Sequence, residues 1–157
     1  EQQPPSQKRC AAGRSGKSPK RGGIEVLTGG IAAVVAALCA LTRRLLWDHP
    51  ASAGGVIQFK PLWNRGAAFG LPVGRRAVAA LSGLCLTWVW LCRGRNPVGA
   101  GLLLGGGASN LWERLCHGRV FDYVHFPKAP GPLRHYVFNL ADFAILAGVL
   151  ALLRKKH

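Results

Sequence analysis

The chain has 157 residues, of which 49% are hydrophobic, and its formal net charge is +15 at pH 7. This length corresponds to a single domain. So few acidic residues among so many apolar ones argue against an ordinary soluble domain, whose surface mixes both charges. The basic residues lie mainly in the tails and in short loops, without a recognition-helix, zinc-finger or RNP pattern, so we expect no nucleic-acid partner. Basic flanks facing anionic membrane lipids explain the charge better.

The pattern of apolar runs predicts an all-α polytopic membrane protein with four transmembrane helices. Residues 1–23 are polar and basic, and their Gly, Ser, Pro and Lys content predicts a disordered cytoplasmic tail. Residues 24–153 form the expected membrane domain, and residues 154–157 form a basic C-terminal tail. The expected spans are approximately 24–42, 77–92, 98–115 and 137–153. Several are at or below the ~17 to 25 residues of a usual spanning helix, but the runs have no polar stripe, which favours membrane spans over amphipathic soluble helices.

Two loops are expected on the side opposite the termini. Residues 54–69 hold short apolar segments punctuated by Gly and Pro, and these predict one or two strands at the membrane interface. Residues 121–136 carry several prolines and predict an irregular loop. An even number of spans places both basic termini on one side, which the positive-inside rule makes cytoplasmic. In the third run, Gly101 and Gly105 predict close approach of a neighbouring helix.

Asp122 and Asp142 lie at the edge of, or just inside, long apolar segments. Ionisable groups there are costly and usually mark a functional site with a nearby partner, and the simplest partner for each aspartate is the other. An ordinary loop aspartate paired with Arg119 explains Asp122 about equally well. Asn139 shares a helix face with Asp142 and is expected to cap the helix, but capping does not account for Asp142 itself.

The remaining polar candidates predict structure more than chemistry. Glu113 and Arg114 are expected to form a structural ion pair or to orient a loop. The cysteines are scattered without a C-x-x-C pair or a spacing with His that suits a metal. We therefore expect no disulfide framework, no metal site and no cofactor.

Three motifs follow one another along the chain. The first is Asn64-Arg65-Gly66-Ala67-Ala68-Phe69. The second is Gly106-Gly107-Ala108-Ser109-Asn110-Leu111-Trp112-Glu113-Arg114, followed by Gly118-Arg119-Val120-Phe121-Asp122-Tyr123. The third is Phe138-Asn139-Leu140-Ala141-Asp142-Phe143-Ala144-Ile145. They resemble the N-x-G-A-A-F, G-G-x-x-G-N-L-x-D-R with G-x-V-x-D-F, and F-N-x-A-D-x-x-I motifs of signal peptidase II, the prolipoprotein signal peptidase, a family of four-span membrane aspartyl proteases.

The chain departs from the family pattern at several positions. Ser109, Glu113 and Tyr123 stand where the family has Gly, Asp and Phe. The first-span motif D-Q-x-[S/T]-K appears as Cys39-Ala40-Leu41-Thr42-Arg43, so the Asp-Gln pair is lost while a Thr and a basic residue remain. Because both Asp122 and Asp142 are present, these departures concern stability or substrate handling more than the chemistry.

The resemblance implies an intramembrane aspartic endopeptidase in the bacterial cytoplasmic (inner) membrane, a monomer with its active site near the extracytoplasmic face. Its substrates would be lipid-modified prolipoproteins, cut just before the diacylglyceryl cysteine. Asp122 and Asp142 would be the catalytic residues. When two carboxyls lie close together, one keeps its proton while the other is ionised and can accept one. The implied substrate-binding or supporting residues are Asn64, Gly66, Asn110, Arg114 and Asn139. The loop at 54–69 would cradle the substrate, the loop at 121–136 would act as a lid, and globomycin-type cyclic peptides would inhibit.

Two other functions are compatible with the residues. A small proton-coupled transporter can also keep two intramembrane carboxylates, although internal repeats are not evident in this chain. A protease-derived protein that binds lipoprotein precursors without cutting them would fit the altered first-span motif at Cys39 and Ala40.

Overall fold

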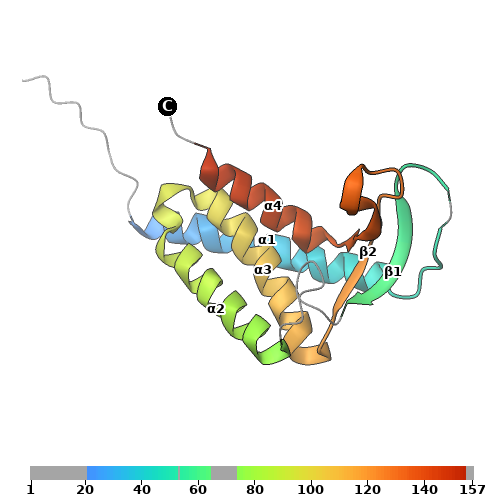
Figure 1. Cartoon of the computed structure of the whole chain (residues 1–157). Helices are drawn as coiled ribbons and strands as arrows, with labels where there is room; N and C mark the ends of the chain where they lie inside the picture. The colour runs from blue at the N-terminus through green and yellow to red at the C-terminus, as the bar shows by residue number, and fades with distance from the viewer. Residues whose placement is uncertain (1–20, 53, 65–73, 155–157) are drawn as a thin grey trace, which may run out of the picture.

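The computed structural model describes residues 21–52, 54–64 and 74–154. Four helices lie side by side, and a three-stranded sheet lies beyond one end of them, opposite the C-terminal end of the last helix (Figure 1). In chain order the elements are α1 (Arg21–Leu46), β1 (Gln58–Asn64), α2 (Arg75–Leu91), η2 (Arg93–Arg95), α3 (Pro97–His117), β2 (Val120–His125), η3 (Gly131–His135), β3 (Val137–Phe138) and α4 (Leu140–Leu153).

Each predicted span overlaps one helix, but the ends differ. α1 extends beyond the predicted range at both ends. The fourth prediction starts too early, because Val137 and Phe138 pair with β2 as strand β3 and the helix begins only after its N-cap, Asn139. Within the described part of the chain, α1 is the one helix both long and apolar enough to cross a membrane, and residues 76–91 and 140–153 form shorter apolar helices.

Helix α3 is packed against the other three helices through its glycines. A Cβ on Gly105 would lie 2.6 Å from the carbonyl oxygen of Ala32 in α1, and one on Gly106 would lie 2.6 Å from that of Ala141 in α4. A Cβ on Gly107 would lie 2.6 Å from a methyl of Leu86 in α2. These contacts confirm the close approach predicted for this segment, and they bring the polar end of α3 against both α1 and α4.

The sheet has the strand order β1-β2-β3, with antiparallel pairing throughout. The strand expected within 54–69 is therefore confirmed as β1. The prediction of an irregular loop over 121–136 is wrong at its start, since residues 121–125 belong to β2. Successive side chains of a strand point to opposite faces, so the strand turns Phe121 and Tyr123 to one face and Asp122 to the other.

Candidate active site

Asp122 lies in the middle of β2, in a strand and not in the loop that the sequence predicts. Its side chain is buried, with 3% of the residue exposed. The Nδ2 of Asn64, on the neighbouring strand β1, donates to Oδ2 at 3.1 Å, and the Nδ2 of Asn139 donates to Oδ1 at 2.8 Å. Arg119, the alternative partner, instead places its guanidinium over the ring of Trp63 at 4.2 Å.

Asp142 lies in the first turn of α4, where it completes a capping box with Asn139. The backbone N–H of Asp142 donates to Oδ1 of Asn139 at 3.1 Å, and the backbone N–H of Asn139 donates to Oδ2 of Asp142 at 3.0 Å. The expectation that capping does not account for Asp142 is therefore wrong: one of its oxygens satisfies an otherwise unpaired donor at the helix start. The other oxygen, Oδ1, accepts from Asn110 at 2.9 Å.

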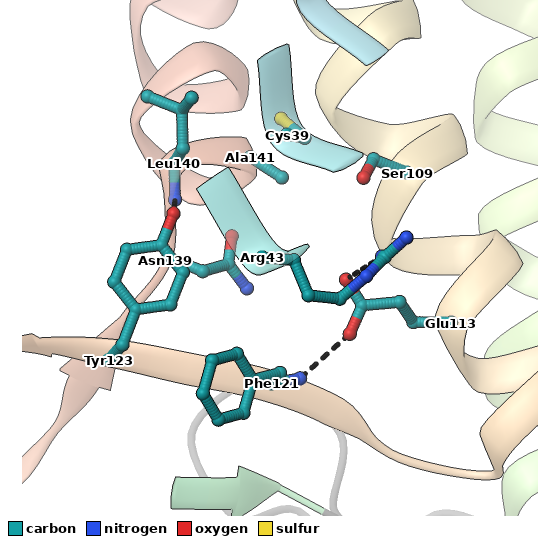
Figure 2. A pocket seen from close by; sticks show the side chains of 9 residues that line it. All are labelled: Cys39, Arg43, Ser109, Glu113, Phe121, Tyr123, Asn139, Leu140 and Ala141. Atoms are coloured by element: carbon teal, nitrogen blue, oxygen red, sulfur yellow. Dashed lines mark hydrogen bonds and ion pairs between the residues drawn. The ribbon is translucent and has the colours of Figure 1, made fainter. Parts of the chain in front are cut away.

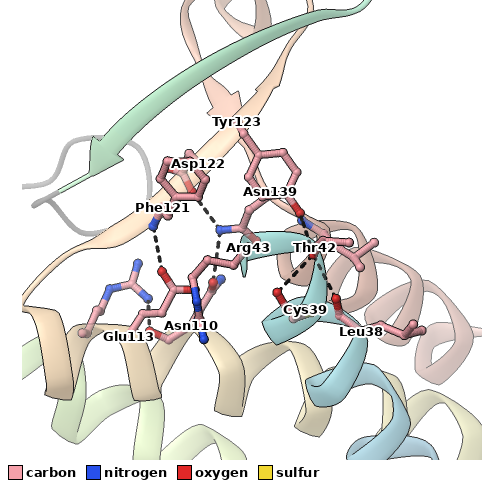
Figure 3. A network of polar contacts seen from close by, with 12 residues as sticks. Leu38, Cys39, Thr42, Arg43, Asn110, Glu113, Phe121, Asp122, Tyr123 and Asn139 are labelled. Atoms are coloured by element: carbon pink, nitrogen blue, oxygen red, sulfur yellow. Dashed lines mark hydrogen bonds and ion pairs between the residues drawn. The ribbon is translucent and has the colours of Figure 1, made fainter. Parts of the chain in front are cut away.

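Asn139 and Asn110 join the two aspartates into one network. The Nδ2 of Asn139 donates both to Asp122 and, at 3.1 Å, to Oδ1 of Asn110, and Asn110 in turn donates to Asp142. Figure 3 shows the Asn139 side chain between those of Asn110 and Asp122. Residues from β2, α3 and the start of α4 thus converge at the end of the bundle that carries the sheet.

Burial raises the pKa of Asp122 from its ordinary value of 3.8 to about 6. The hydrogen bond from Asn64 opposes this rise in pKa and the charge of Asp142 adds to it, while the hydrogen bond from Asn139 and the charge of Arg114 oppose it. A buried carboxyl is harder to ionise because the charged form loses its hydration. The result is a carboxyl that exchanges its proton near neutral pH, as a general acid or base must.

The other predicted residues have distinct places in the structure. Arg114 donates from Nη1 to the backbone oxygen of Asn110 at 3.4 Å. Gly66 lies outside the described residues. Of the two expectations for Glu113 and Arg114, an ion pair with each other or the orienting of a loop, the first is wrong. The ion-pair partner of Glu113 is Arg43 of α1, whose Nη1 lies 2.6 Å from Oε1.

Tyr123 and Thr42 belong to the same region, although sequence analysis assigned them no role. The hydroxyl of Tyr123 donates to Oγ1 of Thr42 at 3.2 Å and accepts from the backbone N–H of Leu140 at 3.1 Å. It therefore links α1, β2 and the start of α4. The sequence gives only a weak indication of this role: Tyr123 stands where the family has Phe, and its additional hydroxyl needs a hydrogen-bond partner when buried.

Several departures from the family pattern meet at one small cavity of about 10 Å³. Cys39, Ser109, Glu113 and Tyr123 all line it, together with Arg43 and Asn139 (Figure 2). These positions come from α1, α3 and β2, and the structure brings them together around one cavity. The aspartates themselves are outside this set of lining residues.

Two solved structures share the fold of this chain. A bacterial membrane enzyme determined by the in meso method at 2.3 Å resolution superimposes with a TM-score of 0.67 and 18% identity, covering 85% of this chain and 86% of that one. Another, at 1.9 Å resolution, gives a TM-score of 0.68 and 19% identity over 87% of this chain and 96% of that one. The fold is thus that of a bacterial membrane enzyme.

Sequence comparison identifies the family. The family profile described as signal peptidase (SPase) II matches residues 31–155. The lipoprotein signal peptidase of Nitrobacter hamburgensis is 36% identical over 148 residues, covering 81% of this chain and 90% of that protein. That of Methylorubrum extorquens is 36% identical over 119 residues, covering 69% of this chain and 68% of that protein. The chain belongs to the signal peptidase II family, which confirms the resemblance and favours a peptidase over a transporter.

Proposed function

We propose that this protein is an aspartic endopeptidase that removes signal peptides from diacylglyceryl-modified prolipoproteins, with Asp122 and Asp142 as its catalytic pair. The observation that carries the proposal is the shared hydrogen-bond network. Asn139 donates from its side chain to Asp122 and from its backbone to Asp142, so one residue holds both carboxyls. The relatives named lipoprotein signal peptidase supply the substrate class.

The chemistry follows from two carboxyls in different protonation states. The ionised carboxyl accepts a proton from a water molecule as the water oxygen attacks the scissile carbonyl carbon. The protonated carboxyl donates its proton to the carbonyl oxygen, which gives a tetrahedral gem-diol intermediate. The carboxyl that took the water proton then passes it to the leaving nitrogen as the C–N bond breaks, while the gem-diol returns a proton to the other carboxyl. Because the two groups titrate as a unit, the active form is the pair that holds a single proton.

Asparagine side chains suit the surroundings of such a pair. Each of the amides of Asn64, Asn110 and Asn139 donates to a carboxylate oxygen without adding a charge. A cation in the same positions would stabilise the ionised form strongly and would remove the proton that the reaction needs. We therefore assign Asn64, Asn110 and Asn139 to holding and tuning the pair. Arg114 supports it through Asn110, and Gly66 retains the role that the family motif implies.

The fold supports a site near one surface of the membrane. We propose that all four helices span the cytoplasmic membrane, with the sheet and the segment from β2 to β3 on the extracytoplasmic side as cradle and lid. Helix α4 has 14 residues, and at a rise of 1.5 Å per residue it covers about 21 Å, less than the roughly 30 Å hydrocarbon core. On this proposal the first turn of α4, with Asp142, lies just inside the membrane boundary, close to the water that hydrolysis needs.

The test uses purified protein in detergent and a lipidated precursor, with the product followed by gel and its cleavage site read by mass spectrometry. We expect the wild-type protein to release a peptide ending just before the lipidated cysteine, and to leave unlipidated precursor uncut. Asp122→Asn and Asp142→Asn should abolish cleavage, and Asp48→Asn, an exposed aspartate beyond α1, should not. Near-normal cleavage by either active-site variant would overturn the catalytic pair.

A further inference from the structure

Glu113 is a buried carboxylate that joins three elements next to the catalytic pair. It projects from α3, and only 4% of the residue is exposed. Its Oε1 accepts from Nη1 of Arg43 in α1 at 2.6 Å, and its Oε2 accepts from the backbone N–H of Phe121 in β2 at 2.8 Å. Figures 2 and 3 show the Glu113 side chain between the two donors.

The contact to Phe121 bears directly on Asp122, because the two residues share a peptide bond. A buried backbone N–H requires an acceptor, and here that acceptor is a side chain of α3. This hydrogen bond ties β2 directly to α3, the helix that also supplies Asn110 to the network. A displacement of about 1 Å in a catalytic group costs on the order of a hundredfold in rate.

The ion pair with Arg43 fixes the orientation of the Glu113 carboxylate. The side chains of Arg43 and Glu113 are 18% and 6% exposed, so the pair is largely shielded from water. Removing one member of such a pair leaves an uncompensated buried charge. Arg43 holds Oε1, and Oε2 is thereby aimed at the strand.

We propose that Glu113, held by Arg43, is a positioning residue that sets the place of Asp122 in the active site. This inference rests on the proposed catalytic role of Asp122. It predicts that loss of the Glu113 carboxylate lowers kcat of correctly folded protein, while KM for the precursor changes little, because the substrate is not expected to contact Glu113.

Glu113→Gln is an informative variant because glutamine has nearly the same shape. Its side chain has one acceptor oxygen and one amide that only donates. If the oxygen faces Arg43, the amide faces the N–H of Phe121. If the oxygen faces Phe121, the amide faces Arg43. Either way, one donor meets another donor, so glutamine cannot replace both contacts.

The chain offers a position from which the missing charge can be restored. Cys39 is one turn before Arg43 on α1, at a spacing of four residues that places the two side chains on one helix face. It is buried, with 6% of the residue exposed, and lines the same cavity as Arg43 and Glu113. In the Glu113→Gln background, an aspartate at position 39 would supply a carboxylate to Arg43. The glutamine oxygen would then be free to accept from the N–H of Phe121.

The experiment compares wild type, Glu113→Gln, Glu113→Gln with Cys39→Asp, and the control Glu25→Gln. Glu25 also forms an ion pair between elements, with Arg93, but at the opposite end of α1. Cleavage of the lipidated precursor gives kcat and KM per folded molecule, and hydrogen exchange over residues 120–125 reports the contact to β2. We expect Glu113→Gln to lower kcat about tenfold or more, with KM changed less than about threefold. Its backbone amides in β2 should exchange hydrogen faster than those of wild type. Adding Cys39→Asp should restore most of the lost kcat.

The inference would be overturned by a wild-type kcat for folded Glu113→Gln, or by a kcat loss equal to that of Glu25→Gln with unchanged hydrogen exchange in β2. A double variant no faster than Glu113→Gln would also count against it. Should Glu113→Gln fail to fold, Arg43→Gln serves in its place, with the same expected changes in kcat, KM and hydrogen exchange but without the Cys39→Asp variant, which needs Arg43. Asp122→Asn in parallel separates the proposals: if it cleaves normally, the catalytic pair is wrong, whereas if it is inactive while Glu113→Gln is normal, only the positioning role is wrong.

Discussion

At the scale of single residues, Asn139 combines two structural tasks: it caps α4 and it contacts both aspartates. Its Oδ1 caps α4, its backbone N–H donates to Asp142, and its Nδ2 donates to Asp122 and Asn110. The same side chain therefore starts the helix and connects the two carboxyls. Asp142 can therefore serve as a capping residue and still take part in the proposed catalytic pair: its capping bond uses Oδ2 alone, and Oδ1 accepts from Asn110.

The raised pKa of Asp122 predicts a pH dependence of cleavage. The pKa is about 6 because burial outweighs the hydrogen bonds that favour the ionised form. As pH rises through this value the pair loses its single proton, so kcat/KM should fall above about pH 6. Asn64→Leu removes an amide that lowers the pKa, which should move the alkaline limb to higher pH. A pH–rate profile of both proteins checks this, and a limb that moves to lower pH would contradict the assignment.

The sequence singled out Asp122 and Asp142 as candidates because acidic residues are so rare in it that each one in or near an apolar run needs a reason. It did not reveal the partners of Glu113 or the role of Tyr123. Arg43 and Glu113 are separated by 70 positions, and no local pattern connects residues that meet only through helix packing. The sequence suggested Arg114 as the ion-pair partner of Glu113 because it is the neighbouring cation, but the partner in the structure is Arg43.

At the scale of secondary structure, α3 is the element that organises the bundle. Its glycines allow the backbones of α1 and α4 to approach, and its last turns carry Asn110 and Glu113. In a membrane the association of helices depends on such close packing and on hydrogen bonds between them, since lipid tails are as apolar as the helices. The sequence predicted this contact from the spacing of small residues alone.

Gly105→Ala should destabilise the protein, because its new methyl would meet the backbone oxygen of Ala32 at 2.6 Å. Overpacking of this kind costs about 1 to 3 kcal/mol. Gly83→Ala in α2 is the matched control, since a Cβ there meets nothing within 4 Å, and it should be neutral or slightly stabilising because alanine favours the helix. Thermal unfolding in detergent measures both, and equal melting temperatures for the two variants would contradict the packing described for α3.

Strand β2 was missed for a physical reason. Its pairing joins Phe121 to Trp63, residues from distant parts of the chain, and β1 carries a register irregularity between Phe59 and Leu62. Strand pairing of this kind depends on partners that the local sequence does not show. The prolines that follow were interpreted as signs of a loop over the whole segment, but they come only after the strand ends.

At the scale of the whole molecule, the proposed topology has the sheet and the active site on the extracytoplasmic side. Cys116 tests this, because it is exposed and lies in the last turn of α3, at the end of the bundle that carries the site. A membrane-impermeant maleimide added to intact spheroplasts should label the wild-type protein. The label should drop to background in Cys116→Ser. Labelling of Cys116 only after the membrane is permeabilised would show the opposite orientation.

The central claim is that Asp122 and Asp142 act as one unit, and the single-turnover cleavage rates of four proteins test it most directly: wild type, Asp122→Asn, Asp142→Asn and the double variant. Groups that act together are strongly non-additive. We predict that each single variant is slower than wild type by at least about 10⁴-fold and that the double variant is no slower than either single variant. A single variant within tenfold of wild type, or a double variant slowed by the product of the two single effects, would contradict the account.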